Sequence, residues 1–290
     1  MSLLAPLAYL LSGILLGRLL PDIKNALAIT LTTVLIPFII IYNLLAYQPG
    51  TATLALFSVA FCSLLFVCGY VVWKDRLTAL TLSYLNVGWL GLPIAIALFG
   101  DGASRIIIAA YVGSSIFGNI AASFALQSGM TWRGLSYRLL KMPPVIAVIV
   151  GLVLHVLPLR LVQNEQLSVL YDIAKQLMSM AGMGILGIWL YSSKVTLQSL
   201  RASIPHAIVR AVVGTNVVAL FIGGCRSLGY DPFPDSIWAL ALLPLLPPAA
   251  NIVVLETYYC GTGNSAQTIV CGTVISLVLV FVFSLILMAS

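Results

Sequence analysis

The sequence contains very few charged residues. Only 8% of its 290 residues are Asp, Glu, Lys or Arg, whereas an average soluble protein has about 25%. Hydrophobic residues make up 61% of the chain, and the mean hydropathy is +1.10. This composition excludes an ordinary soluble domain and predicts many membrane spans rather than a single anchor. The basic residues are scattered singly, so the net charge of +6 does not indicate nucleic-acid binding.

Patterns that carry enzyme or metal chemistry are also missing from the sequence. Its 5 cysteines show no C-x-x-C spacing. His155 and His206 have no H-x-x-x-H spacing and no acidic companion that would suggest a metal. No nucleophile, base and orienting residue stand together. We therefore expect no catalytic residue, no metal and no cofactor, and an intramembrane enzyme is the alternative from a different functional class.

Hydropathy and helix-breaking residues predict an all-α polytopic membrane protein with ten transmembrane helices. The apolar run from Leu3 to Leu20 has no positive segment before it, so we interpret it as the first span rather than as a signal peptide. The predicted spans are residues 3–20, 26–47, 52–73, 78–100, 104–127, 142–158, 168–192, 203–224, 236–259 and 265–289.

The distribution of Lys and Arg predicts the orientation. With the N-terminus outside, nine basic residues fall in inner loops and three in outer loops, which is a positive-inside bias. Both termini should then be extracytoplasmic. Ten spans divide into five plus five, and because five is odd the second half is inverted. We assign residues 1–127 to the first repeat, 128–141 to a basic cytoplasmic loop, and 142–290 to the second repeat.

Two apolar stretches contain residues that interrupt a helix. Residues 86–95 include two glycines and Pro93, and residues 244–251 include three prolines. Because Pro93 has no N–H, the carbonyl of Trp89 loses its i→i−4 partner, and we predict a break there. In hydrocarbon such a break survives only where protein or a water-filled cavity surrounds it. Two interrupted segments in corresponding halves are typical of a secondary transporter's binding site.

Four motifs distributed along the chain point to one family. Residues 86–93 follow the pattern N-x-G-x-x-G-x-P and precede Leu-Phe-Gly at 98–100. Pro37-Phe38-Ile39 follows P-x-L/I, Pro143-Pro144 precedes a glycine, and residues 246–251 read L-P-P-A-A-N. Over nearly its whole length the chain resembles the auxin efflux carrier family, the PIN-like permeases of the bile-acid/sodium symporter superfamily.

This resemblance implies a ten-helix inverted repeat in which helices 4 and 9 cross at their proline breaks. Helices 1, 2, 6 and 7 would form a scaffold. Helices 3–5 and 8–10 would form a transport domain that moves against it like an elevator. Family members carry organic anions, which are auxin in plants and small mono- or dicarboxylates in bacteria.

The sequence departs from the family after the second break. Many relatives have an acidic pair followed by Tyr-Gly there, whereas this chain has the single acid Glu256, displaced upstream. Sodium-coupled relatives use a ninth-helix glutamate near the crossing, and Ala249 and Ala250 occupy that neighbourhood here. The resemblance therefore disfavours sodium coupling.

The chemistry of the two breaks predicts an anion site. A half-helix that begins after a break presents unpaired N–H groups and the positive end of its dipole. We expect these half-helices to begin at residues 94–97 and 249–252. Asn86 and Asn251 can each hold a carboxylate oxygen or satisfy a freed carbonyl, and both interpretations stay open. The predicted substrate-binding residues are Asn86, Gly91, Pro93, Ile94, Pro247, Pro248, Ala250, Asn251 and Asn43.

Ionisable residues inside predicted spans are functional candidates because their burial in lipid is costly. Glu256 is either a proton-coupling carboxylate or a hydrated residue at the cytoplasmic end of helix 9. Asp172 and Lys175 are spaced as a helical i,i+3 pair and are interpreted as a structural tie near the outer surface. Arg210 either snorkels to the cytoplasmic face or attracts anions.

Helices 2 and 7 should supply the fixed wall of the site. Asn43 and Gln176 either meet substrate there or bond across helices. Glycines in helix 1 (Gly13 and Gly17) and in helix 7 form flat surfaces for close packing. Packing within one chain is the common explanation of such surfaces, and a homodimer or a sliding interface is the alternative.

Together these observations predict a secondary transporter of the bacterial cytoplasmic (inner) membrane that moves a small organic carboxylate by alternating access. Transport would be proton-coupled or uncoupled. The alternatives are a sodium-coupled symporter of bile-acid-transporter type and a membrane sensor on the same fold that binds ligand without transporting it.

Overall fold

A computed structural model describes residues 4–45, 51–99, 102–127, 141, 143–157, 164–192, 195–229 and 237–289. Within these ranges the regular structure is helical, apart from one isolated antiparallel bridge. The α-helices are α1 (Leu4–Leu19), α2 (Ile23–Thr30), α3 (Ile36–Leu45), α4 (Thr51–Trp73), α5 (Arg76–Ser83), α6 (Leu92–Phe99), α7 (Gly102–Leu126), α9 (Pro143–Val156), α10 (Glu165–Ser192), α11 (Leu197–Ser227), α12 (Asn251–Cys260) and α13 (Ser265–Ala289). Two π-helical turns, η1 (Leu31–Leu35) and η2 (Val87–Gly91), and the 3-10 helix η4 (Ile237–Leu245) complete them.

Six of the described helical segments are long and apolar enough to cross a membrane. They are Ile23–Tyr42, Ala52–Trp73, Ile106–Leu126, Glu165–Tyr191, Leu197–Ser227 and Ser265–Leu287. Large apolar side chains on them point outward, and Leu220 on α11 and Phe281 on α13 are 77% and 62% exposed. Such a surface is stable in lipid rather than in water. The chain is therefore an all-helical integral membrane protein, as the composition predicted.

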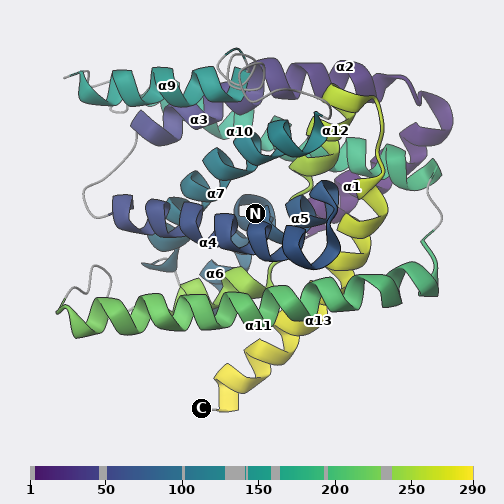
Figure 1. Ribbon diagram of the computed structural model, residues 1–290. Coiled ribbons are helices and arrows are strands. Elements are labelled where there is room, and N and C mark those ends of the chain that lie inside the picture. The colour runs from purple at the N-terminus through teal and green to yellow at the C-terminus, as the bar shows by residue number, and fades with distance from the viewer. Residues whose placement is uncertain are drawn as a thin grey trace.

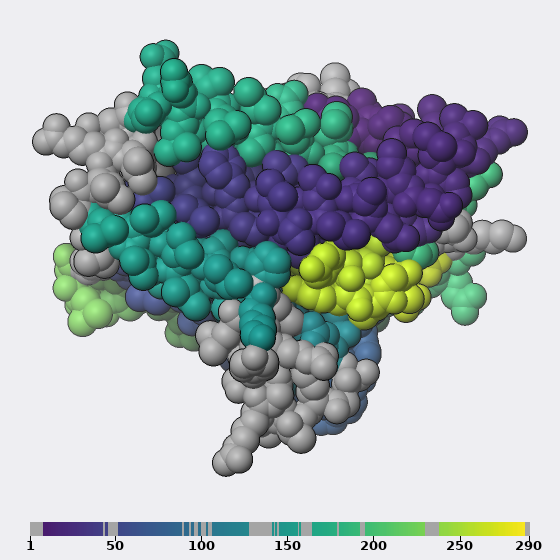
Figure 2. Space-filling model, turned by 90° about the horizontal axis from the view of Figure 1, so that it is seen from above, coloured from purple at the N-terminus to yellow at the C-terminus, as the bar shows by residue number. Residues whose placement is uncertain are grey.

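The helices pack in two groups. α1 lies along α10, and α3 lies along α9, on one side of the molecule (Figure 1). α4 packs on α5 and α7, and α11 packs on α13 and η4. Figure 2, seen from above, shows α2–η1–α3 in purple between α10 and the yellow-green α12. α12 contacts α2, η1 and α10 of the first group, and α7 contacts α3 and α9.

Glycines allow α1 and α10 to approach closely. A Cβ added at Gly13 would lie 2.3 Å from the carbonyl oxygen of Gly184, and one at Gly187 would lie 2.3 Å from that of Leu10. These distances are shorter than any van der Waals contact, so the two backbones touch directly. The predicted glycine surfaces therefore serve packing within one chain, which was the first of the two interpretations.

Prolines 37 and 93 lie inside continuous helices and do not break them. Each follows a π-helical turn by two residues: η1 ends at Leu35 and η2 ends at Gly91. A π turn shifts the hydrogen-bond register by one residue, which accommodates the missing N–H of a proline. The prediction of a break at Pro93 is wrong for this reason, and the interruption lies upstream, at residues 84–86.

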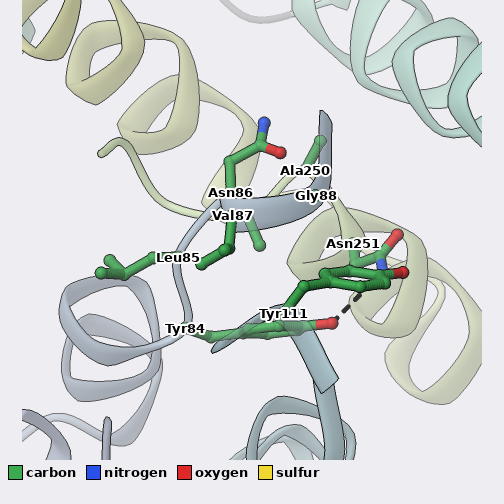
Figure 3. A pocket seen from close by; sticks show the side chains of 9 residues that line it. Tyr84, Leu85, Asn86, Val87, Gly88, Tyr111, Ala250 and Asn251 are labelled. Carbon is green, nitrogen blue, oxygen red and sulfur yellow. Dashed lines mark hydrogen bonds between the residues drawn. The ribbon is translucent and has the colours of Figure 1, made fainter. Parts of the chain in front are cut away.

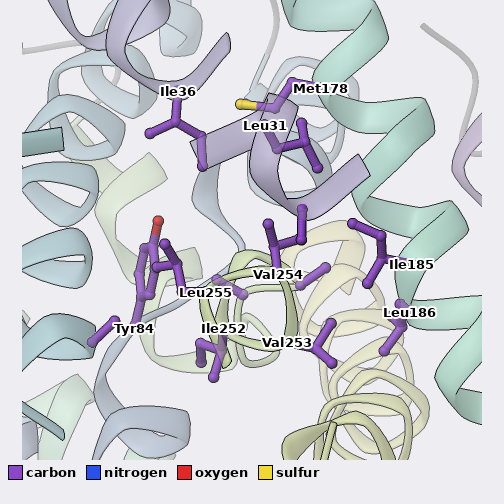
Figure 4. Packing of buried hydrophobic residues seen from close by; sticks show 14 of the residues in the cluster. Leu31, Ile36, Tyr84, Met178, Ile185, Leu186, Ile252, Val253, Val254 and Leu255 are labelled. Carbon is purple, nitrogen blue, oxygen red and sulfur yellow. The ribbon is translucent and has the colours of Figure 1, made fainter. Parts of the chain in front are cut away.

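The interface between the two groups is mainly apolar, and it includes a hydrogen bond from the Nε1 of Trp189 in α10 to the Thr257 hydroxyl in α12 at 2.8 Å. Val253, Val254 and Leu255 of α12 are fully buried. They belong to one cluster with Leu31 and Met178, which come from η1 and α10 (Figure 4). Burial of each such side chain contributes about 1.5–3 kcal/mol when the alternative is water. The apolar character of α12 therefore fixes its place against α2, η1 and α10.

Replacement of Gly13 by Ala tests the contact of α1 with α10. The added methyl group would meet backbone rather than a flexible side chain. We therefore expect the free energy of unfolding to fall by roughly 1–3 kcal/mol, and the Tm in detergent to fall with it. Gly223→Ala is the control, since a Cβ there meets nothing within 4 Å and Ala favours a helix. Equal Tm values for the two variants would contradict this packing.

Candidate functional site

The two interrupted segments satisfy each other's backbone. The N–H of Asn86 donates to the carbonyl of Pro247 at 2.9 Å, and the N–H of Ala249 donates to the carbonyl of Tyr84 at 2.8 Å. These two bonds form an antiparallel bridge between Leu85 and Pro248. All six of these residues are buried. Without the bridge, four polar backbone groups would lose their partners away from water.

Local sequence explains why both segments are extended here. A residue that precedes proline is disfavoured in the α conformation, so the Pro247-Pro248 pair holds the chain extended. Neither proline has an N–H, so the pair can take part in backbone hydrogen bonds only through its carbonyl groups. Tyr84 is likewise extended, with φ −88° and ψ 106°. The Asn86 N–H of the first segment therefore pairs with the Pro247 carbonyl, and the second segment donates in return from Ala249, the first residue after the prolines.

Helices begin again directly after the bridge. η2 starts at Val87 and α12 starts at Asn251. The expected start of α12 agrees with the structure, whereas the expected start at residues 94–97 is wrong, because the π turn continues into α6. The first turn of any helix carries N–H groups without an intrahelical acceptor. Both helix N-termini face the same small recess.

This recess lies beside the bridge and has an empty volume of about 220 Å³. Its lining brings together Asn86, Ala250 and Asn251 from the predicted residues, together with Tyr84 and Tyr111. In Figure 3 the hydroxyl groups of both tyrosines lie near Asn251, and the amide of Asn86 points away from them. The Nδ2 of Asn251 donates to the Tyr84 hydroxyl at 3.2 Å. Its Oδ1 is buried and has no hydrogen-bond partner among the described residues.

The tyrosines were missed by the sequence reasoning, although glycines mark where their rings lie. A Cβ at Gly88 would lie 2.7 Å from the Tyr111 ring, and one at Gly118 would lie 2.3 Å from the Tyr84 ring. Both glycines therefore admit an aromatic ring against the backbone. Tyr84 is only two residues before Asn86 in the sequence, and this position beside the break could have identified it as a candidate site residue.

A second cavity adjoins the recess, and a lysine side chain lies in its wall. It has an empty volume of about 310 Å³ and shares Gly88 and Tyr111 with the recess. Its other wall is α10, with Tyr171, Lys175 and Met178. The sequence showed no lysine near either break because Lys175 is distant along the chain. The tertiary structure brings it there.

The predicted tie between Asp172 and Lys175 is an electrostatic interaction rather than a close ion pair. Asp172 is exposed, and no carboxylate of the described residues lies within 4.0 Å of the Lys175 amine. That amine lies 5.9 Å from the centroid of the Tyr171 ring. The partly buried ammonium has Asp172 as an electrostatic neighbour but no carboxylate in hydrogen-bond contact among the described residues, so it can still attract an anion.

The other predicted residues lie around the recess or outside it. Ile94 is 5% exposed and packs in an apolar cluster with α4 and α7. Gly91 faces Leu246, whose Cδ1 would lie 2.7 Å from an added Cβ. Pro248 lines a different pocket, next to α11. The side chains of Pro93 and Asn43 lie outside the described residues.

Glu256 is buried and forms hydrogen bonds with the chain segment that follows α12. It is 1% exposed, so the interpretation as a hydrated residue at a helix end is wrong. α12 continues to Cys260 and ends at Gly261, which has a left-handed φ of 68°. The returning chain then donates to the carboxylate from the Thr262 hydroxyl at 2.7 Å and from the backbone N–H groups of Asn264 and Ser265 at 2.7 and 2.9 Å. Glu256 thereby caps the start of α13.

Two further predictions are settled by side-chain positions. The Nε2 of Gln176 donates to the Tyr9 hydroxyl at 3.5 Å, so Gln176 bonds across helices α10 and α1. Arg210 is 1% exposed, and its snorkelling to the surface is therefore wrong.

No protein-family model matches the chain, and no curated protein sequence matches it significantly. Function is therefore argued from the geometry of the site.

Replacement of Glu256 by Gln tests the capping role. The amide NH2 would face backbone donors and replace charge-assisted hydrogen bonds, each worth about 1.5–3 kcal/mol. We expect a clear fall in Tm, whereas the exposed Glu165→Gln in the first turn of α10 should leave Tm nearly unchanged. An unchanged Tm together with a lost pH dependence of ligand binding would instead favour a coupling role for Glu256.

Proposed function

We propose that this protein is a secondary transporter that moves a small organic anion by alternating access. Its substrate carboxylate binds where the two interrupted segments meet. The observation that carries the proposal is the recess into which two helix N-termini, the buried Asn251 amide and two tyrosine hydroxyl groups converge.

The recess has the chemistry that a carboxylate requires. Helix N-termini provide N–H donors and about half a positive charge each. The tyrosine hydroxyl groups and the asparagine amides add neutral donors. The unpartnered Oδ1 of Asn251 indicates that its amide can turn when ligand binds. No acidic side chain lines the recess among the described residues.

Lys175 supplies the full positive charge that the recess itself lacks. It stands on α10, whereas Gly88 and Tyr111 belong to η2 and α7 on the opposite wall of the adjoining cavity. A carboxylate bound near Gly88 would therefore be attracted to both walls at once. If the second group moves, the anion leaves the neighbourhood of Lys175.

The apolar contact of α12 with α2–α3 and α10 suits such movement. Its side chains make mainly dispersion contacts, which have no strict register, and few hydrogen bonds must break for the surfaces to slide. We take α1–α3, α9 and α10 as the scaffold, and α4–α7 with η4 and α11–α13 as the moving domain. This division assigns ten spans, five to each inverted repeat, to the chain.

The proposed location is the bacterial cytoplasmic membrane, with both termini extracytoplasmic, and the sequence motifs resemble those of the auxin efflux carriers. The basis is the positive-inside bias of the loops. If the protein forms a homodimer, we propose that the two copies meet through surfaces other than the one where α1 and α10 contact each other.

The test is a measurement of transient currents from proteoliposomes on a solid-supported membrane. Small mono- and dicarboxylates are added rapidly, in sodium and in potassium, at two pH values. We expect a current for at least one carboxylate that does not depend on sodium. A strict sodium requirement would favour the symporter. Ligand binding without current or exchange of labelled substrate would favour the sensor.

Asn251→Ala and Lys175→Gln should each weaken the apparent affinity for that carboxylate by about ten-fold or more, since each removes a hydrogen bond or charge contact to an anion. Arg201→Gln is the matched control, because it removes one positive charge from the exposed start of α11. Unchanged affinity in both variants, in protein with a normal Tm, would overturn the proposed site.

A further inference from the structure

A third cavity encloses a buried arginine on the other side of Pro248. It has an empty volume of about 220 Å³. Ser203, His206 and Arg210 line it from one face of α11, at helical spacings of three and four residues. Thr81 of α5 and Thr268 of α13 complete its polar lining.

The guanidinium of Arg210 has few partners. One Nη donates to the Ser276 hydroxyl at 3.1 Å, while Nε is buried without a hydrogen-bond partner among the described residues. No carboxylate of those residues lies within 4.0 Å of it. The Nδ1 of His206, on the same wall, is also buried and unpartnered. The cavity therefore gathers donors and one full positive charge.

A buried charge of this kind needs a counter-charge, because desolvation of an isolated ion costs several kcal/mol even after relaxation. Thr81 lies in the last turn of α5, where the helix dipole offers at most about half a negative charge. The remaining charge is not supplied by any described acid. A water molecule would satisfy Nε but would not neutralise the guanidinium.

We propose that this cavity is a second anion site, distinct from the substrate recess, which binds a small monovalent anion between Arg210 and the hydroxyl groups around it. Chloride is the abundant anion of that chemistry, and the carboxylate of a small organic acid is the other source. The bound anion joins α5, α11 and α13 behind the bridge residue Pro248, so it stabilises the interrupted segments from the side away from Lys175.

Trp73 provides a built-in probe for the site. Its ring lies 4.6 Å from the ring of His206, edge to face. Iodide quenches tryptophan fluorescence on contact, so iodide bound at Arg210 should quench Trp73. The experiment is a titration of the purified protein with iodide in gluconate, repeated in the presence of chloride and in the presence of formate.

We expect a saturable component of quenching in the wild type. Trp73→Phe should abolish this component without altering Arg210, and chloride should compete for it. Competition by formate alone would assign the site to carboxylates. In Arg210→Gln the saturable component should be lost, or weakened about ten-fold or more, whereas Arg201→Gln should keep it.

The stability of the protein gives an independent readout. Chloride should raise the Tm of the wild type relative to gluconate and should not raise the Tm of Arg210→Gln. If Arg210→Gln does not fold, the Trp73→Phe variant and the competition of chloride with iodide in the wild type still test the proposed site. Quenching that stays linear in the wild type, with no effect of chloride on Tm, would overturn the second site. That result would not bear on the carboxylate recess, which lacks Arg210.

Discussion

The architecture depends on one backbone interaction, the antiparallel bridge between Leu85 and Pro248. Two helices stop inside the molecule, and each leaves polar groups that hydrocarbon cannot solvate. The two bonds of the bridge satisfy four of these groups with one another. Because the bridge residues are extended, the helices that follow start at the same point, and their positive ends converge on one recess. The same interaction that makes the break tolerable thus creates the candidate binding site.

Positive charge is placed on both sides of this bridge, while described acids are kept away from it. Lys175 borders the cavity that opens beside Gly88, and Arg210 borders the cavity behind Pro248. The one buried acid of α12, Glu256, is occupied by three donors at the far end of that helix. This arrangement of the described residues supports the proposed anion sites rather than a cation site built on carboxylates.

In the proposed mechanism, α12 links this electrostatic arrangement to movement. Its N-terminus forms part of the recess, its middle packs on η1 and α10 through apolar side chains, and its C-terminal part holds the loop to α13 through Glu256. A shift of α12 against α10 changes the distance between the recess and Lys175. Most of the contact of α12 with η1 and α10 is apolar, and a hydrogen bond from Trp189 to Thr257 joins α10 to the C-terminal part of α12.

The sequence by itself determined the membrane class, the helical fold and the positions of two interruptions to within a few residues, because hydropathy and proline act locally. It also placed Asn251 near a helix start and predicted that the glycines of α1 and α10 form surfaces for close packing. It misplaced the first break, since a π turn absorbs Pro93 and the extended conformation of residues 84–86 is stabilised by a partner more than 150 residues away. Tyr84, Tyr111, Lys175 and the burial of Arg210 were decided by tertiary structure alone. Which side chains face one cavity depends on how distant helices pack, and no local pattern encodes that contact.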